Sequence, residues 1–369
     1  MDGIGNGGGI QEMSLKWMKN IDRTIVQIDI LSYNKVKPDN FRERVAELGG
    51  NVYIIESFQD KGKFWKSITQ TRAFFSKHKD YDILHAHASS KALFILMFAA
   101  LYGIKRRILH SHTSRIVVRG FIGKFIATVF RRPALFFTTD YFACSKEAGE
   151  FLFGKIAIKR NKVNIVHNAV DLTQFKFDSL IRENIRNEIM GNEKHFLIGN
   201  VGRFMLPKNH HFLLKIYAET LKCDPSIRLC CVGNGGLEGE IHQKAKDMGI
   251  YDKIYFLGFR DDVKDVMQSF DLLLMPSLFE GLPVTGVEAQ AVGVPVLYSD
   301  TITKDAAILP SSSFMSLNDS PEVWAKKILS YKNMKHEADP HKWIREKGYD
   351  IVIETKKLQQ YYENCVEKR

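Results

Sequence analysis

The chain has 369 residues, of which 45% are hydrophobic and 26% charged, and this balance is that of an ordinary soluble globular protein of about two domains. Its five cysteines include no CxxC spacing, which argues against a disulfide framework and a cysteine-bound zinc site and indicates a reducing cytoplasm. The net charge of +11 is concentrated between Leu101 and Lys162, a segment with thirteen Lys and Arg residues and three Asp and Glu residues. We therefore expect an acidic partner there.

Short strand-like runs alternate with helix-length segments along the chain. The runs of the first half cover residues 24–31, 51–57, 81–87, 105–112, 140–145 and 161–168. Those of the second half cover residues 195–203, 227–235, 253–259, 271–277 and 294–300. The alternation predicts parallel sheets covered by helices on both faces, and the two series predict two doubly wound α/β domains. The longest apolar run, 92–103, is too short to span a bilayer and is expected to be a buried helix.

We expect a first domain over residues 1–170, an interdomain linker over 171–194 and a second domain over 195–345. Residues 346–369 are expected to form a helix that packs back toward the first domain. A doubly wound domain opens with a strand, a Gly-rich turn and a helix, yet the Gly-rich turn GNGGGIQ begins at residue 5. Either the first strand is missing, or the true start lies upstream and Met1 is an internal methionine; the second alternative is favoured.

A phosphate site is indicated by GNVGRFMLPKNHHFLL, residues 199–214. A strand is expected to end near Val201, and Arg203 and Lys208 follow where the strand gives way to a helix. Ligands of parallel sheets bind at this carboxyl edge. Two cations and the amides of a helix N-terminus suit a diphosphate. Taken alone, an arginine and a lysine at this spacing are more often two solvated surface charges.

A second acidic and apolar segment, LFEGLPVTGVEAQAVGVPV, covers residues 278–296. Glu280 is expected in the loop after a buried strand. Glu288 is expected about one turn inside a helix over residues 284–291 that Gly293 ends. Carboxylates accept hydrogen bonds from vicinal hydroxyls, as in a ribose or a hexose. The alternative for Glu288 is a first-turn acid that the helix dipole favours.

Pro283 lies just before or at the first helical position, where its missing N–H costs little. The free amides of Val284 and Thr285 are then expected to point out of the helix N-terminus and to suit an anion. Phosphate, ribose and sugar hydroxyls together describe a nucleotide-sugar.

Two H-x-H pairs, His85 with His87 and His110 with His112, lie in expected strands. Side chains alternate along a strand, so each pair shares a face, and this pattern suggests a metal. No third ligand is evident from the sequence, and strand histidines often pack, so no metal site is expected. The run DYD, 80–82, is interpreted as a polar turn before a buried strand and not as a D-x-D metal motif.

The segment 119–137 is expected to form a basic amphipathic helix, with Lys124 and Arg131 opposite the apolar face. Such a helix suits an anionic membrane surface. A core-packing helix with a solvated polar face is the alternative. No nucleic-acid recognition module is evident, so nucleic acid is not an expected partner. The apolar face comprises Phe121, Ile122, Phe125, Ile126, Val129 and Phe130.

The stretch EGLPVTGVE resembles the E-x7-E motif of the retaining nucleotide-sugar glycosyltransferases with the GT-B fold, in the large family numbered four. YSDTITKD and SLNDSPEVWAKKIL resemble the subgroup found in bacterial capsular and exopolysaccharide assembly. The resemblance covers almost the whole chain. Other stretches resemble, in chain order, the family's first Gly-rich loop (GGGIQ), acceptor-domain strands (YDILHAH and RRILHSHTSR), interdomain signature (VHNAVDLTQF), phosphate-binding loop (GNVGRFMLPKNH) and base-binding loop (FLGFRDDV).

The resemblance implies two Rossmann-like domains facing a cleft. It implies a retaining, metal-independent hexosyltransferase that moves a hexose from a nucleotide diphosphate sugar, expected to be a UDP-sugar, to a lipid-linked saccharide. No cofactor is expected, because the nucleotide-sugar is the donor substrate. The enzyme would be cytoplasmic and peripheral on the inner membrane face. The alternatives are a nucleotide-sugar 2-epimerase of the same fold and an inactive partner subunit.

The resemblance also implies roles for single residues. Arg203 and Lys208 would hold the donor diphosphate, and Glu280 would hold sugar hydroxyls. Glu288 would bind the ribose, and His112 would contact the donor sugar and help to set the reactive geometry. Further donor contacts would come from the amides of Gly9, Val284 and Thr285, from a base pocket of Gly258, Phe259 and Arg260, and from Gly233, where a side chain would clash with the nucleotide.

Overall fold

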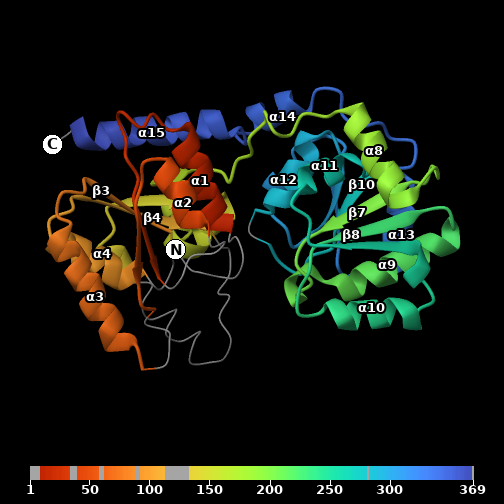
Figure 1. Cartoon of the computed structure of the whole chain (residues 1–369), viewed down its shortest axis with the longest axis horizontal. Coiled ribbons are helices and arrows are strands. Elements are labelled where there is room, and N and C mark those ends of the chain that lie inside the picture. Colours follow the sequence, from red (N-terminus) through yellow and green to blue (C-terminus); the bar gives the residue numbers. More distant parts are fainter. Residues whose placement is uncertain are drawn as a thin grey trace. The chain divides into compact units, whose positions relative to one another are not determined.

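The protein is described by a computed structural model that covers residues 9–33, 40–57, 62–87, 92–112, 133–280 and 282–367. The chain folds into two compact units (Figure 1). Unit 1 comprises Met1–Asn168 and Ile351–Arg369, and unit 2 comprises Ala169–Asp350. The helix α15 (Ile351–Glu367) thus belongs to unit 1, where it packs against α1 (Gly9–Asn20).

The described part of unit 1 contains two parallel sheets. The strands β1 and β2 form one, and β3, β4, β5 and β6 form the other in that order. A cavity of about 760 Å³ is lined by residues of β1 and β3 and by parts of α1, α3 and α15. Between α1 and α15 the elements are β1 (Ile30–Tyr33), α2 (Phe41–Glu47), β2 (Val52–Ile55), α3 (Phe64–Lys77), β3 (Ile83–Ala86), α4 (Ala92–Leu101), β4 (Arg106–Ser111), β5 (Asp140–Ala143), α6 (Lys146–Phe153), α7 (Lys155–Lys159) and β6 (Val163–Ile165).

Two sequence predictions for unit 1 have different outcomes. The apolar run 92–103 forms α4, whose side chains are buried in two clusters on opposite sides of the helix, so the buried helix is confirmed. The first strand was expected over 24–31 but runs over Ile30–Tyr33. The carboxylate of Asp22 accepts hydrogen bonds from the amide (2.9 Å) and hydroxyl (2.7 Å) of Thr24. This turn over residues 22–24 keeps the start of the expected strand out of the extended conformation.

Unit 2 is one doubly wound domain. Its six strands are all parallel in the order β12-β11-β10-β7-β8-β9. The five strands expected from the sequence are present, and β12 is an additional edge strand of only three residues. The elements are α8 (Ser179–Met190), β7 (Leu197–Val201), η1 (Leu206–Lys208), α9 (His210–Cys223), β8 (Arg228–Val232), α10 (Glu238–Asp247), η2 (Tyr251–Lys253), β9 (Ile254–Gly258), α11 (Val263–Gln268), β10 (Leu272–Met275), α12 (Val284–Ala291), β11 (Val296–Ser299), η3 (Lys304–Ala306), β12 (Ser313–Met315), α13 (Pro321–Leu329) and α14 (Pro340–Glu346).

Helices cover both faces of the unit 2 sheet, because successive strand residues point to opposite sides. Leu197 of β7 lies in the cluster with α11 and α12, and its neighbour Ile198 lies in the cluster with α9 and α13. Each fully buried side chain of this size contributes about 1.5–3 kcal/mol. The buried sheet therefore holds the loops at its carboxyl edge in fixed positions.

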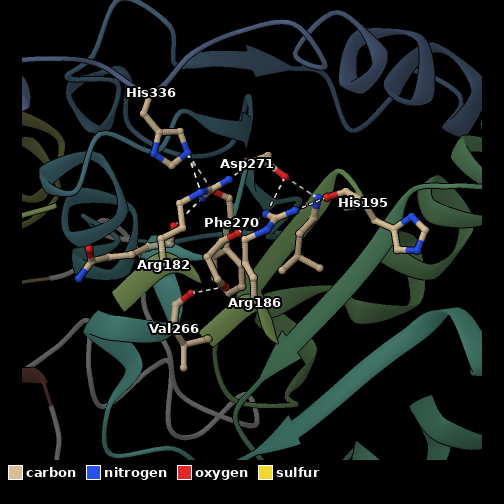
Figure 2. A network of polar contacts seen from close by, with 10 residues as sticks. Arg182, Arg186, His195, Val266, Phe270, Asp271 and His336 are labelled. Atoms are coloured by element: carbon tan, nitrogen blue, oxygen red, sulfur yellow. Dashed lines mark hydrogen bonds and ion pairs between the residues drawn. The ribbon is translucent and has the colours of Figure 1, made fainter. Parts of the chain in front are cut away.

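At the amino edge of this sheet, Asp271 precedes β10 and binds two arginines of α8 (Figure 2). Its carboxylate accepts hydrogen bonds from Arg182 (2.5 Å), from Arg186 (3.1 Å) and from the amide of Leu197 (2.7 Å). Arg182 also donates to the carbonyl of Phe270 (2.9 Å). These bonds tie α8 to the sheet, so the segment 171–194 is part of unit 2 and not the linker expected from the sequence.

Candidate functional site

The strand order of unit 2 reverses between β7 and β10, which lie side by side in the middle of the sheet. Ligands of doubly wound sheets bind at the carboxyl ends of the strands at such a point. There the structure brings together Lys208, from the loop after β7, and Glu280, from the loop after β10. The Lys208 Nζ lies 2.6 Å from Glu280 Oε1, and the side chains are only 20% and 17% exposed. An ion pair shielded from bulk water in this way is stronger than an exposed one.

Backbone and side-chain bonds hold the two loops together around this ion pair. The amide of Leu278 donates to the carbonyl of Pro207 (2.8 Å). The side-chain amide of Asn209 donates to the carbonyl of Pro276 (3.0 Å), and Asn209 has the left-handed conformation, φ 56° and ψ 43°. The hydroxyl of Ser277 donates to the carboxylate of the glutamate (3.1 Å). The paired charges are therefore positioned by both loops.

The lysine side chain lies across Gly202, the residue that follows β7. A Cβ atom at Gly202 would lie 2.9 Å from Cε of Lys208, so the glycine leaves the space that the lysine occupies. Arg203 is the next residue in the chain and is partly exposed. The two cations expected to hold a diphosphate thus come from one short loop at the switch point.

The helix α12 runs over Val284–Ala291 with Pro283 as its N-cap, which confirms the bounds expected from the sequence. The amide of Gly286 donates to the carbonyl of Pro283 (2.9 Å). The amides of Val284 and Thr285, in the first turn, have no acceptor within the helix. Val284, Thr285 and Glu288 are partly exposed and share one side of the helix, three and four residues apart.

Gln290 fixes α12 in place and was not anticipated from the sequence. Its side chain is fully buried, and its amide oxygen accepts hydrogen bonds from the backbone amides of Ile308 (2.8 Å) and Leu309 (2.9 Å). A glutamine within the otherwise apolar run AQAVG is the one sequence signal of this bond network. Its amide nitrogen donates to the carbonyl of Gly286 (2.9 Å), the hydroxyl of Tyr298 (3.0 Å) and the carbonyl of Ala306 (2.8 Å).

The loops after β7, β8 and β9 contact one another through their backbones. Gly233 donates its amide to the carbonyl of Gly258 (2.7 Å), and Gly202 donates to the carbonyl of Val232 (2.9 Å). Gly233 has a φ of 128°, and a Cβ atom there would lie 2.3 Å from the carbonyl oxygen of Gly202. A side chain at Gly233 would thus clash with the backbone of Gly202. The clash expected from the sequence was with a bound nucleotide.

The residues expected to line a base pocket lie at the carboxyl end of β9. The side chain of Phe259 is exposed. Arg260 is engaged elsewhere: its guanidinium pairs with Glu188 of α8 (2.5 Å) and with Asp262 (2.6 Å). Hydrogen bonds from Arg260 to these carboxylates, to Asp262 above all, raise the pKa of its guanidinium. In this arrangement the charge of Arg260 is taken up by two carboxylates.

In unit 1 the structure brings both H-x-H pairs together. The register of β3 and β4 places Ala86 beside Leu109, and therefore His87 beside His110. His85 Nε2 lies 3.0 Å from His110 Nδ1, and His87 Nδ1 lies 2.8 Å from His112 Nε2. Possible ligand atoms of three of these residues lie within 4.8 Å of one another. The expectation that these histidines lack a third ligand is therefore wrong. Strand pairing supplies His110, which lies 23 positions after His87 in the chain.

These four histidines, termed the histidine cluster below, are held neutral. Burial, followed by the charge of His112, lowers the pKa of His85 to about 3. Burial lowers the pKa of His112 to about 4, although a hydrogen bond with Asn168 acts in the opposite direction. At neutral pH His112 therefore offers one N–H donor and one acceptor, without charge.

Some expected site residues lie wholly or partly outside the described part of the chain. Gly9 is the first residue of α1, and nothing further is described of it. The expected amphipathic helix 119–137 lies outside the described residues up to residue 132. Among the helices that are described, none is long and apolar enough to cross a bilayer.

Two family patterns together match nearly the whole chain. Residues 7–174 match the family described as glycosyltransferase family 4, and residues 181–351 match the glycosyl transferases group 1. The chain is 33% identical over 325 residues to EpsF of Bacillus subtilis (strain 168), whose name classes it as a glycosyltransferase, and the match covers 88% of this chain and 84% of that one. It is 26% identical over 250 residues, 64% of this chain and 62% of the other, to the UDP-Gal:alpha-D-GlcNAc-diphosphoundecaprenol alpha-1,3-galactosyltransferase of Escherichia coli.

Solved structures share the fold. HepE of Anabaena, crystallised with UDP and glucose, superposes with a TM-score of 0.77 at 18% identity over 98% of this chain and 97% of that one. The lipopolysaccharide outer core galactosyltransferase WaaB superposes with a TM-score of 0.72 at 14% identity over 100% and 98%. The fold is GT-B, with one Rossmann-like domain in each unit.

Proposed function

The chain belongs to the glycosyltransferases with group 1 and family 4 domains, and on this premise we propose that it transfers a hexose from a UDP-sugar, with retention, to a lipid-linked saccharide. The observation that supports the donor site most strongly is the Lys208–Glu280 ion pair at the switch point of unit 2. A cation held by an internal carboxylate is ready to exchange that partner for a phosphate.

The mechanism follows from this exchange. As the diphosphate enters, Lys208 and Arg203 bind its oxygens, and the first amides of α12, from Val284 and Thr285, donate to it. When the bond between the sugar and the diphosphate breaks, the acceptor hydroxyl bonds to the same carbon from the same face, and its proton passes to the leaving diphosphate. The preorganised donors stabilise the negative charge that grows on the diphosphate. Glu280, released by the lysine, then accepts hydrogen bonds from sugar hydroxyls.

We propose further donor contacts from the same edge of the unit 2 sheet and from two residues of unit 1. Glu288 lies on the partly exposed side of α12, one turn beyond the amides, and binds the ribose hydroxyls. Gly258, Phe259 and the backbone of Arg260 line the base pocket, and Gly233 keeps the neighbouring loop in place. The amide of Gly9 adds a contact to the diphosphate, and neutral His112 donates a hydrogen bond to the sugar.

Two cations in one loop do the work that a divalent ion does in metal-dependent transferases. Arg203 and Lys208 neutralise the leaving diphosphate directly, so the proposed transfer needs neither a metal nor another cofactor at the diphosphate. Removing divalent ions is therefore expected to leave donor binding unchanged.

The acceptor is proposed from the relatives. The Escherichia coli relative is named for a diphosphoundecaprenol-linked acceptor, and a Campylobacter jejuni relative is named as an N-acetylgalactosaminyltransferase on a diphospho-undecaprenol-linked saccharide. The basic segment from Leu101 to Lys162 suits an anionic membrane surface. We place the enzyme in the cytoplasm, peripheral on the inner membrane face, in capsular or exopolysaccharide synthesis.

The test uses purified protein, a panel of radiolabelled nucleotide-sugars and a lipid extract from bacterial membranes. The expected result is label in the lipid fraction from one UDP-hexose, with the anomeric configuration retained. Glu280→Gln should abolish transfer and leave UDP binding nearly unchanged, and Glu188→Gln, a control on α8, should transfer normally. UDP binding without transfer from any donor would refute the transferase; epimerisation of a UDP-sugar without acceptor would identify the 2-epimerase instead.

A further inference from the structure

Three residues of the histidine cluster, His85, His87 and His110, offer nitrogen ligands that the proposed transfer does not use. His85 and His87 come from the end of β3, and His110 and His112 come from β4 and the residue after it. The cluster belongs to unit 1, whereas the cations and helix amides proposed to bind the donor diphosphate belong to unit 2. Its properties can therefore be tested independently of the transfer reaction.

The positions of three of these residues match a metal site. Two histidines separated by one residue on a strand point to the same side, and a third on the paired strand lies opposite them. Three histidines with one open position are a known zinc ligand set. Bonds of about 2.0–2.1 Å to a tetrahedral ion place the nitrogens roughly 3.4 Å apart. Candidate ligand atoms of His85, His87 and His110 already lie within 4.8 Å of one another, and one pair, His85 Nε2 and His110 Nδ1, lies 3.0 Å apart.

The second observation is an unsatisfied buried nitrogen. His110 is 1% exposed, and its Nε2 has no hydrogen-bond partner among the described residues. This nitrogen is not the one that faces His85, because His110 Nδ1 lies 3.0 Å from His85 Nε2. The ring would therefore bind an ion through Nδ1, and its Nε2 would carry the proton and need a separate partner such as a water. Because the ring is neutral, it already has the form in which imidazole binds a metal.

The surroundings orient the rings as those of a metal site do. His85 Nδ1 lies 2.6 Å from the hydroxyl of Tyr362 in α15, so its Nε2 is the nitrogen that faces the other histidines. Histidine ligands typically bond their second nitrogen to such a partner. The indole of Trp17 stacks on His85 and His110 with ring centroids 6.0 Å apart. His85, His87 and Trp17 also line the cavity of unit 1, which gives an ion a way in.

We propose that His85, His87 and His110 bind one divalent transition-metal ion of the zinc class, which joins β3 to β4 and leaves one coordination position toward the cavity. Imidazole nitrogens favour zinc, cobalt, nickel and copper over the oxygen-preferring magnesium and calcium. His112 lies beside the site through its contact with His87 and is oriented by it. The bound ion is structural and takes no part in the proposed diphosphate chemistry.

The experiment uses the full chain without a polyhistidine tag, stripped with EDTA and titrated with Co²⁺. The expected result is one equivalent of Co²⁺ with the visible absorption of a tetrahedral site, displaced by Zn²⁺ and not by Mg²⁺. His110→Gln and His87→Gln should each weaken binding at least tenfold. His211→Gln, a histidine of unit 2 paired with Glu240, is the matched control and should bind as the wild type does.

Tyr362→Phe provides a readout that simple packing would not change. It retains the ring and removes the partner of His85, and it should weaken Co²⁺ binding by roughly tenfold or more. Circular dichroism shows whether each variant is folded, and UDP binding, measured in EDTA, should be unchanged in all of them. Absence of a stoichiometric Co²⁺ spectrum in the folded wild type would overturn the proposal, as would equal affinity in folded His87→Gln and His110→Gln.

Discussion

The two edges of the unit 2 sheet each have a conspicuous ion pair, and the two pairs differ in how they are completed. At the amino edge, Asp271 is bound at once by Arg182, Arg186 and the amide of Leu197 (Figure 2). At the carboxyl edge, the Glu280 carboxylate is bound by the Lys208 ammonium and the Ser277 hydroxyl.

The two ion pairs differ in how easily the cation can leave its carboxylate for an incoming anion. At the amino edge the two arginines also donate to backbone carbonyls, so giving up one carboxylate bond would break several others. At the carboxyl edge the lysine is a single flexible donor beside a helix N-terminus, and it can leave the glutamate for an incoming anion. The first arrangement stabilises the fold, and the second is available to a ligand.

The largest expected effect is on activity, at the carboxyl edge. Lys208→Ala should lower the rate of transfer by roughly 10²–10³-fold, the cost of one electrostatic donor to developing charge. The free energy of unfolding should also fall, by about 1–3 kcal/mol, because Glu280 loses its cation and keeps the hydrogen bond from Ser277. Comparing kcat and the free energy of unfolding in the same preparation checks this; a loss of stability with transfer unchanged would mean that the lysine belongs to the fold.

At the amino edge we expect the main effect on stability and none on ligand binding. Asp271→Ala should lower the free energy of unfolding by about 2–3 kcal/mol, less than the loss for a fully buried ion pair because the side chains are about one-fifth exposed. Urea unfolding measures it. UDP affinity of the protein that remains folded should be unchanged, and a parallel loss of UDP affinity would contradict the separation of the two edges.

In unit 1, the buried neutral histidines of the histidine cluster should make stability depend on pH. The pKa of His85 is lowered to about 3 and that of His112 to about 4, so the unfolded chain binds more protons than the folded one below the unfolded value near 6.5. Stability should therefore be complete above pH 6.5 and fall as the pH is lowered toward 4, by about 1.4 kcal/mol per pH unit for each proton. Urea unfolding in EDTA at pH 7.0, 6.0 and 5.0 measures the slope, and His112→Gln should reduce it.

The smallest effect is expected at Arg260. Its partners Glu188 and Asp262 are 50% and 39% exposed, so Arg260→Ala should cost about 0.5 kcal/mol of stability. UDP affinity should fall less than threefold, since only the backbone of this residue is proposed to contact the base. A tenfold loss of UDP affinity would show that the guanidinium leaves its carboxylates to bind the nucleotide.

Much of unit 2 could be predicted from the sequence, because local patterns determine it. The five long strands are short apolar runs, and α12 lies between a proline and a glycine that mark its ends. The pairing of Lys208 with Glu280 could not be predicted, because it depends on which strands are neighbours. The three-residue strand β12 is too short for a periodic pattern, and α8 resembles a polar linker until Asp271, 85 residues after Arg186, pairs with it.

The same limit applies to the histidines. The sequence shows two H-x-H pairs, but their combination into one cluster depends on the register of β3 and β4. The sequence indicated that position 233 needs a glycine, but it did not show the reason, which is that a Cβ atom there would clash with the backbone of Gly202. Local chemistry is thus visible in the sequence, and the partner of each group requires the fold.

The central claim is that UDP binds at the carboxyl edge of unit 2 and leaves the amino edge unchanged. Amide hydrogen exchange of the wild-type protein with and without saturating UDP measures this directly. We expect slower exchange in residues 202–209, 258–262 and 284–288, with no change in residues 182–197. Saturating UDP that leaves the first turn of α12 unprotected, or that protects the amino edge instead, would contradict it.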